Sequence, residues 1–198
     1  MGLAAALVPS LIALAPGAPV APVFDPTQLG MSLAAWRSEP LAPGIDPSAR
    51  PACATDPALA AADPNPLSPR GEDRTSALVC GYVSVYGRLA LGAQVPLIGR
   101  FKASRLRFLF QDGRLAEIDC DASVDAFNDV TAFLDSLDGP PADAARDVLH
   151  SKIGSLAQVR MSWRRDGATI QLIDPEGPNY DHLTIRLAAS SGSGANSR

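Results

Sequence analysis

The chain has 198 residues, of which 46% are hydrophobic and 19% charged, proportions typical of a folded globular protein and not of a disordered chain. A formal net charge of −4 at pH 7 and a pI near 5.1 provide no general attraction to phosphate backbones. The composition therefore argues against a nucleic-acid partner. The length suits a single domain.

Residues 1–23 carry no charged side chain and are predicted to be a secretory signal peptide or a disordered leader. The apolar run over 3–14 is interrupted by Pro9 and is too short to span a membrane. Small residues provide cleavage patterns ending at Ala15 and at Gly17, although no basic residue precedes the run. We therefore expect a periplasmic or secreted protein with no integral membrane span in its mature chain.

Three cysteines, Cys53, Cys80 and Cys120, leave at least one thiol outside any intramolecular disulfide. A Cys53–Cys80 or a Cys80–Cys120 bridge would each stabilise the fold by about 3 to 4 kcal/mol on the loop-entropy model, so loop length does not choose between them. We favour Cys53–Cys80, because it would tether a proline-rich segment. Cys120 falls among the apolar positions of a predicted strand, where a buried thiol packs as a small hydrophobe.

A short helix is predicted over residues 28–37, where Leu29, Leu33 and Trp36 recur at helical spacing. The following segment, 38–76, contains eight prolines and almost no hydrophobic periodicity, so it is predicted to be a long irregular insertion. Loops of this length are uncommon in a compact domain unless they are functional or held by a bridge.

The first group of strands follows the insertion. Residues 77–86 form a β-branched and aromatic run, and residues 105–110 alternate between apolar and more polar side chains. Asp112-Gly113 is typical of a tight turn and leads into a strand over 115–120.

Two helices are predicted next. The first covers residues 124–137, where apolar side chains recur at helical spacing, and it ends before Gly139. The second covers residues 142–152 and ends before Gly154. His150 would then supply a favourable charge at a helix C-terminus and no catalysis.

The second group of strands alternates cleanly between apolar and polar residues. These strands are predicted around residues 158–164, 170–172 and 182–187, with Asp166-Gly167 as the first turn. The ending, 190–198, is rich in serine and glycine and is predicted to be disordered.

Residues 24–189 are thus predicted to form a single α+β domain. Its curved antiparallel sheet of about six strands would be built from two helix-plus-three-strand units, with the helices on one face. The other face would stay open to solvent, as clean alternation implies.

The segment Leu29–Leu33, which opens the first predicted helix, and the strand Gly113–Ile118, which precedes the second, resemble repeated units of known proteins. These are the β-lactamase-inhibitor-protein-like and outer-membrane-assembly-lipoprotein-like families, and the resemblance covers residues 28–187. It departs from them in the proline-rich insertion and in the lack of a lipid-accepting cysteine. The resemblance implies a role in protein binding without fixing a partner.

No catalytic, metal-binding or nucleotide-binding motif stands out. His150, His182 and the cysteines lack the paired spacing of a zinc site, and the cluster Asp119–Asp125 lacks the glycine and glutamate of an EF-hand. Neither a Gly-x-Ser-x-Gly sequence nor a phosphate-binding loop occurs. We therefore predict no catalytic residue, no metal and no cofactor.

The polar positions of the strands provide one candidate binding surface. Opposite the apolar sets they carry basic side chains, with Glu117 and Asp119 among them. A basic, concave surface of this kind would suit an acidic loop or an anionic ligand. Alternatively, and more commonly for such a sheet, the charges pair with one another across strands. The candidate binding residues are Arg105, Arg107, Arg160, Arg164, Arg186 and His182.

These features favour a non-catalytic, exported binding protein that uses the open polar face toward a protein partner or an anionic ligand. Two alternatives stay open. One is a hydrolase-like envelope enzyme whose site is not visible in the sequence. The other is a structural component of the envelope.

Overall fold

The computed structural model describes residues 21–62, 65–68, 77–151, 154–176 and 181–190. The strands are β1 (Arg50–Cys53), β2 (Leu78–Tyr86), β3 (Leu89–Gly92), β4 (Val95–Ile98), β5 (Phe101–Gln111), β6 (Arg114–Ser123), β7 (Asp143–Ser151), β8 (Gly154–Arg165), β9 (Ala168–Glu176) and β10 (His182–Ala189). The helices are α1 (Leu33–Ser38), α2 (Pro57–Ala60) and α3 (Phe127–Asp138), with 3-10 turns η1 (Pro22–Phe24), η2 (Pro26–Gln28) and η4 (Val124–Ala126).

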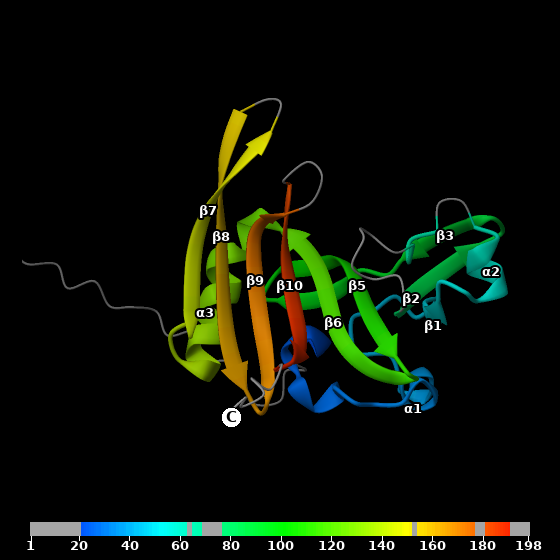
Figure 1. Ribbon diagram of the computed structural model, residues 1–198. Coiled ribbons are helices and arrows are strands. Elements are labelled where there is room, and N and C mark those ends of the chain that lie inside the picture. Colours follow the sequence, from blue (N-terminus) through cyan, green and yellow to red (C-terminus); the bar gives the residue numbers. More distant parts are fainter. Residues whose placement is uncertain (1–20, 63–64, 69–76, 152–153, 177–180, 191–198) are drawn as a thin grey trace, which may run out of the picture.

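All these strands belong to one antiparallel sheet of 10 strands. Its order is β1-β2-β5-β6-β10-β9-β8-β7, with β3 paired to β2 and β4 paired to β5. Figure 1 shows the strands from β7 to β5 side by side, with α3 and the N-terminal helices behind them. One face of the sheet is therefore covered by helices along most of its width.

The predicted fold of about six strands in two helix-plus-three-strand units was wrong. The six predicted strands are present, but the sheet also contains β1, β3, β4 and β7, and α3 is the only helix longer than six residues in the described ranges. The predicted helix over 142–152 is strand β7 instead. Its alanine-rich sequence favours a helix locally, but antiparallel pairing with β8 along its length overrides that preference.

The two Asp-Gly hairpin turns were predicted correctly. Asp112 and Gly113 have φ of 51° and 75°, and Asp166 and Gly167 have the same values. Both turns thus place two consecutive residues in the left-handed region, as the two-residue turns that match strand twist require. They join β5 to β6 and β8 to β9.

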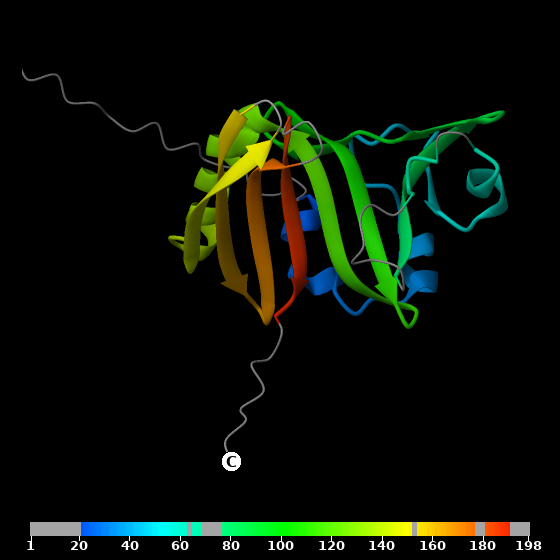
Figure 2. The same cartoon turned by 45° about the horizontal axis from the view of Figure 1, so that its top comes forward.

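The main core lies between the sheet and the helices. Apolar side chains of successive strands point to the same face, and Phe24 of η1, Trp36 of α1 and Leu134 of α3 pack against them. Figure 2 shows these helices on the far side of the curved sheet. Trp163 also donates a hydrogen bond from Nε1 to Asp135 Oδ1 (3.1 Å), which fixes α3 to β8.

A second, smaller core lies on the other face at the β1–β2 end. Leu59 of α2 and Leu67 pack there against Val79 and Val83 of β2. The space is tight, because a Cβ on Gly81 would lie 2.8 Å from Leu67 Cδ2. The prediction that the helices share one face is therefore corrected, since α2 covers the opposite face.

The packed chain extends slightly beyond the predicted boundaries. Ala21, Val23 and Phe24 are buried, although the leader was predicted to reach residue 23; residues 1–20 lie outside the described part. At the other end, the Ser190 N–H donates to Gly167 O (2.8 Å), and residues 191–198 lie outside the described part. Among the described residues, no helix has the length and apolar character needed to cross a membrane.

Candidate functional site on the arginine face

The strand register places all six candidate residues on one face of the sheet, named here the arginine face. Arg107 lies opposite Asp119, and Asp119 lies opposite Arg186 on its other side. Arg186 lies opposite Gln171, which in turn lies opposite Ser162. Residues directly opposite in an antiparallel sheet share a face. Arg105, Arg160, Arg164 and His182 follow the same parity in their own strands.

The centre of the arginine face is buried, which corrects the expectation that this face stays open. Arg107 and Asp119 are 4% and 0% exposed and form a bidentate pair, with Nε to Oδ1 at 2.7 Å and Nη2 to Oδ2 at 3.1 Å. The charges on neighbouring strands meet each other and not solvent. Arg107 is consequently part of the packed structure.

Asp121 organises a second cluster beside this pair. Its Oδ1 accepts a hydrogen bond from Thr184 Oγ1 (3.1 Å) and lies 3.7 Å from His182 Nε2. Arg105 Nε lies 3.9 Å from Asp121 Oδ2. These contacts follow the alternative in which charges pair across strands, so Arg105 and His182 add little uncompensated positive charge.

Arg186 lies between two glutamates. Its Nη2 donates to Glu176 Oε1 (3.0 Å), and its Nε lies 3.9 Å from Glu117 Oε1. The β9–β10 part of the face is thus acidic as well as basic.

A pocket of about 300 Å³ opens on the arginine face above β7, β8, β9 and β10. Its size is at the lower end of the range for ligand sites and suits a single side chain or a small ligand. The polar lining combines an acidic group with hydroxyl, amide and guanidinium donors. The lining residues are Asp143, Ala144, Ala145, Arg160, Met161, Ser162, Gln171, Ile173 and Arg186.

Arg160 is the best-positioned donor in this pocket. Its Nε donates to Gln158 Oε1 (2.9 Å) and lies 3.4 Å from Asp147 Oδ2. Gln158 is itself 4% exposed and donates from Nε2 to the Pro175 carbonyl (2.8 Å), so the guanidinium is held through a buried amide. Within the described ranges, neither terminal nitrogen of Arg160 makes a hydrogen bond.

Two of the six candidate residues, Arg160 and Arg186, are therefore brought together in the pocket, and the other four are not. Arg164 is exposed on the same face of β8 but lies outside the lining. The sequence reasoning missed Ser162, Gln171 and Asp143. The first two follow the polar parity that identified the arginines, whereas Asp143 was assigned to a helix.

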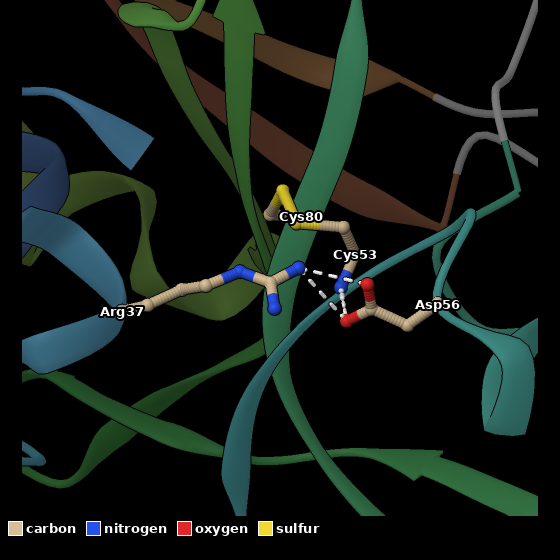
Figure 3. Close-up of a disulfide and its surroundings, with 4 residues drawn as sticks. All are labelled: Arg37, Cys53, Asp56 and Cys80. Atoms are coloured by element: carbon tan, nitrogen blue, oxygen red, sulfur yellow. Dashed lines mark hydrogen bonds and ion pairs between the residues drawn. A yellow bond between two sulfur atoms is a disulfide. The ribbon is translucent and has the colours of Figure 1, made fainter. Parts of the chain in front are cut away.

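The disulfide forms a separate, structural cluster. Cys53 and Cys80 are bonded, as predicted, and lie directly opposite each other in β1 and β2. Figure 3 shows Arg37 reaching both carboxylate oxygens of Asp56 (2.8 and 3.0 Å), while the Cys53 N–H donates to Oδ2 (2.8 Å). Burial tends to raise the pKa of Asp56, but these hydrogen bonds outweigh it and lower the pKa.

Cys120 is the free cysteine and is buried in the main core, as predicted. Burial, reinforced by the neighbouring aspartates, raises the pKa of its thiol well above the ordinary value. The described part of the chain contains no group of three or more His, Cys, Asp or Glu side chains arranged to hold a metal ion.

No protein-family model matches the chain, and comparisons with curated proteins and with solved structures also return no match. The resemblance to the β-lactamase-inhibitor-protein-like and outer-membrane-assembly-lipoprotein-like families stays a prediction.

Proposed function

We propose that this chain is an exported, non-catalytic binding protein that holds an anionic group of its partner or ligand in the pocket above β7–β10. The observation that carries the proposal is the placement of Arg160. Its guanidinium lines the pocket, is oriented by Gln158 and keeps both terminal nitrogens available to a ligand within the described structure. A planar, pre-oriented guanidinium is well suited to a carboxylate or a phosphate.

The rest of the lining supports recognition of a polar anion. The Ser162 hydroxyl and the Gln171 amide add neutral donors beside Arg160, and Arg186 contributes positive potential shared with its glutamates. Asp143 would accept a hydrogen bond from a donor that accompanies the anion. The disulfide supports the exported location, because disulfides persist chiefly in oxidising compartments.

The proposal is tested by titrating the ¹⁵N-labelled protein with glutarate, a simple carboxylate probe, at low ionic strength. We expect saturable chemical-shift changes at the amides of Ser162 and Gln171 and at Nε of Arg160. The variant Arg160→Gln is expected to weaken binding at least fivefold, because it removes the charge while keeping a side chain of similar polarity.

Arg164→Gln is the matched control, since it removes the same charge from the same strand and face outside the pocket. It should change the glutarate affinity less than twofold. Equal affinities for wild type and Arg160→Gln, or shift changes located away from the pocket, would contradict the proposal.

A further inference from the structure

Strand β7 forms a long, exposed edge of the sheet. Within the described structure it pairs with β8 alone, and it ends the strand order opposite β1. Residues 143–150 are all exposed except Leu149, which is partly buried, and Val148 reaches 60% exposure. Figure 1 shows β7 at the margin of the sheet, where its hairpin with β8 projects beyond the neighbouring strands. An exposed edge strand is a template for pairing with another chain.

Within the described structure β1, β3 and β4 also pair with a single strand each, but they are much less suited to accept a strand, since β3 and β4 have only 4 residues each. β1 has 4 residues, includes Pro51, which lacks an N–H, and is bonded to β2 through Cys53. β7 has 9 residues and no proline. Strand addition would therefore be favoured at β7.

The charge pattern of β7 argues against pairing with a second copy of itself. In a two-fold antiparallel pair, residues at equal distances from the central residue lie opposite each other. The registers that pair most of the 9 residues are centred on Arg146, Asp147 and Val148. The first two place Arg146 or Asp147 opposite itself. The third places Arg146 opposite His150 twice, which offers no attraction and is repulsive when the histidine is protonated.

We propose that β7 accepts an extended segment of a partner protein as an additional antiparallel strand. The charges of β7 define the complementary segment: basic residues opposite Asp143 and Asp147, and acidic residues opposite Arg146 and His150. Apolar residues fit opposite Val148 and Leu149, where β7 presents apolar side chains.

The pocket adds one further requirement, which rests on the proposed function. Ala145 of β7 lies directly opposite Arg160 of β8. Only the small methyl group of Ala145 therefore separates Arg160 from a residue that an added strand would place opposite Ala145. An added strand would lie about 10 Å from β8, two strand spacings away, so a glutamate opposite Ala145 and the long side chain of Arg160 can meet above the alanine. The partner segment would thus supply the anion of the pocket.

A synthetic peptide, Glu-Leu-Val-Lys-Glu-Glu-Val-Lys, satisfies all these positions when it runs antiparallel to β7. Added at millimolar concentration to the ¹⁵N-labelled full chain, it should shift the amides of β7 in a saturable way. The charge-inverted peptide Lys-Leu-Val-Glu-Lys-Lys-Val-Glu should bind at least tenfold more weakly. The net charge of −4 would favour the inverted peptide if binding were non-specific.

Proline variants test the edge itself. Successive N–H groups of an edge strand point alternately toward its neighbour and away from it, so one of the variants Val148→Pro and Leu149→Pro, both outside the pocket lining, removes an outward donor while keeping the pairing with β8. The variant of this pair that retains the wild-type melting temperature should lose peptide binding at least tenfold. It should still bind glutarate, which separates the edge from the pocket.

The outcomes separate the two proposals. If Arg160→Gln abolishes glutarate binding while no peptide shifts β7, the edge proposal fails and the pocket proposal stands. If the peptide shifts β7 but a version with alanine opposite Ala145 binds equally well, strand addition stands without the pocket contact. Dimerisation of the wild-type chain that the proline variant abolishes would overturn the choice of a foreign partner.

Discussion

The pair Arg107–Asp119 shows how a single ion pair decides the character of the arginine face. Both side chains are almost fully buried and each satisfies the other through two hydrogen bonds. Burial of two charges is costly, and the pair offsets that cost only while both members are present. Its role is therefore structural.

Arg107→Ala is expected to lower the free energy of unfolding by about 3–5 kcal/mol, because it leaves Asp119 as an uncompensated buried charge. Replacing both partners, Arg107→Met with Asp119→Leu, should cost much less. Urea unfolding monitored by circular dichroism measures the stability change of each variant. Arg164→Ala, on the exposed part of the same face, should change stability by less than about 0.5 kcal/mol. If Arg107→Ala lowers the free energy of unfolding by no more than Arg164→Ala does, the pair is not buried.

Asp174 and Asp46 illustrate opposite effects of environment on a carboxylate. Burial raises the pKa of Asp174, so its charge disfavours the folded state at pH values above that pKa. Asp46 accepts a hydrogen bond from the Ser48 N–H (2.8 Å), which lowers its pKa, so its charge favours the folded state.

Asp174→Asn is expected to raise the free energy of unfolding at pH 7 by less than about 1 kcal/mol, since solvent screens this partly exposed group. The gain should disappear as the pH falls below about 4, where the carboxyl is protonated in both states. Asp46→Asn should have the opposite sign at pH 7. Thermal unfolding between pH 3 and pH 7 measures both curves, and a gain for Asp174→Asn that persists at pH 3 would refute the burial explanation.

At the scale of elements, the pairing of β1 with β2 is the clearest case of a segment held by few contacts. β1 contributes 4 residues, and Cys53 and Cys80 are both fully buried. The disulfide and the small core under α2 together hold a segment that is otherwise rich in proline.

Substituting both bonded cysteines by alanine is expected to lower the free energy of unfolding by about 3 to 4 kcal/mol, because the unfolded chain regains its loop entropy. Urea unfolding under oxidising conditions measures the loss. Cys120→Ala is the control for removing a buried thiol alone and should cost about 1 kcal/mol. Equal losses in the two variants would show that the bridge contributes no more than its packing.

Strand β7 is the element for which local sequence and structure disagree most. Ala144, Ala145 and Leu149 are good helix formers, so a window of the sequence favours a helix. The chain instead pairs this segment with residues 154–162 of β8 and leaves its outer edge free. His150 was predicted to lie at a helix C-terminus. It lies instead on this exposed edge strand, where its Nδ1 is 2.9 Å from Ser155 Oγ.

Considered as a whole, the molecule is a sheet with two unlike faces. The helical face contains the main core, whereas the arginine face carries a buried ionic centre with α2 at one end and the pocket beside β7 at the other. Both proposed sites lie at the β7 end of the sheet. The proposed pocket and the proposed strand site are neighbours there.

Short-range sequence patterns were sufficient to predict several features of the fold. Period-two alternation identified six of the strands and the parity of the arginines, the Asp-Gly dipeptides identified two turns, and apolar spacing identified α3. The bridge Cys53–Cys80 was favoured because it would tether the proline-rich segment, and the structure contains it. Apart from the bridge, each of these features reflects the conformational preferences of residues close together in the chain.

The accessibility of these residues and the way they combine depend instead on long-range contacts. The burial of Arg107, the orientation of Arg160 through Gln158 and the exposure of β7 all depend on strands that meet from distant parts of the chain. Whether a charge is neutralised depends on the residues opposite it on neighbouring strands. A local sequence pattern contains no information about those residues. The arginine face was therefore visible in the sequence, whereas its pocket was not.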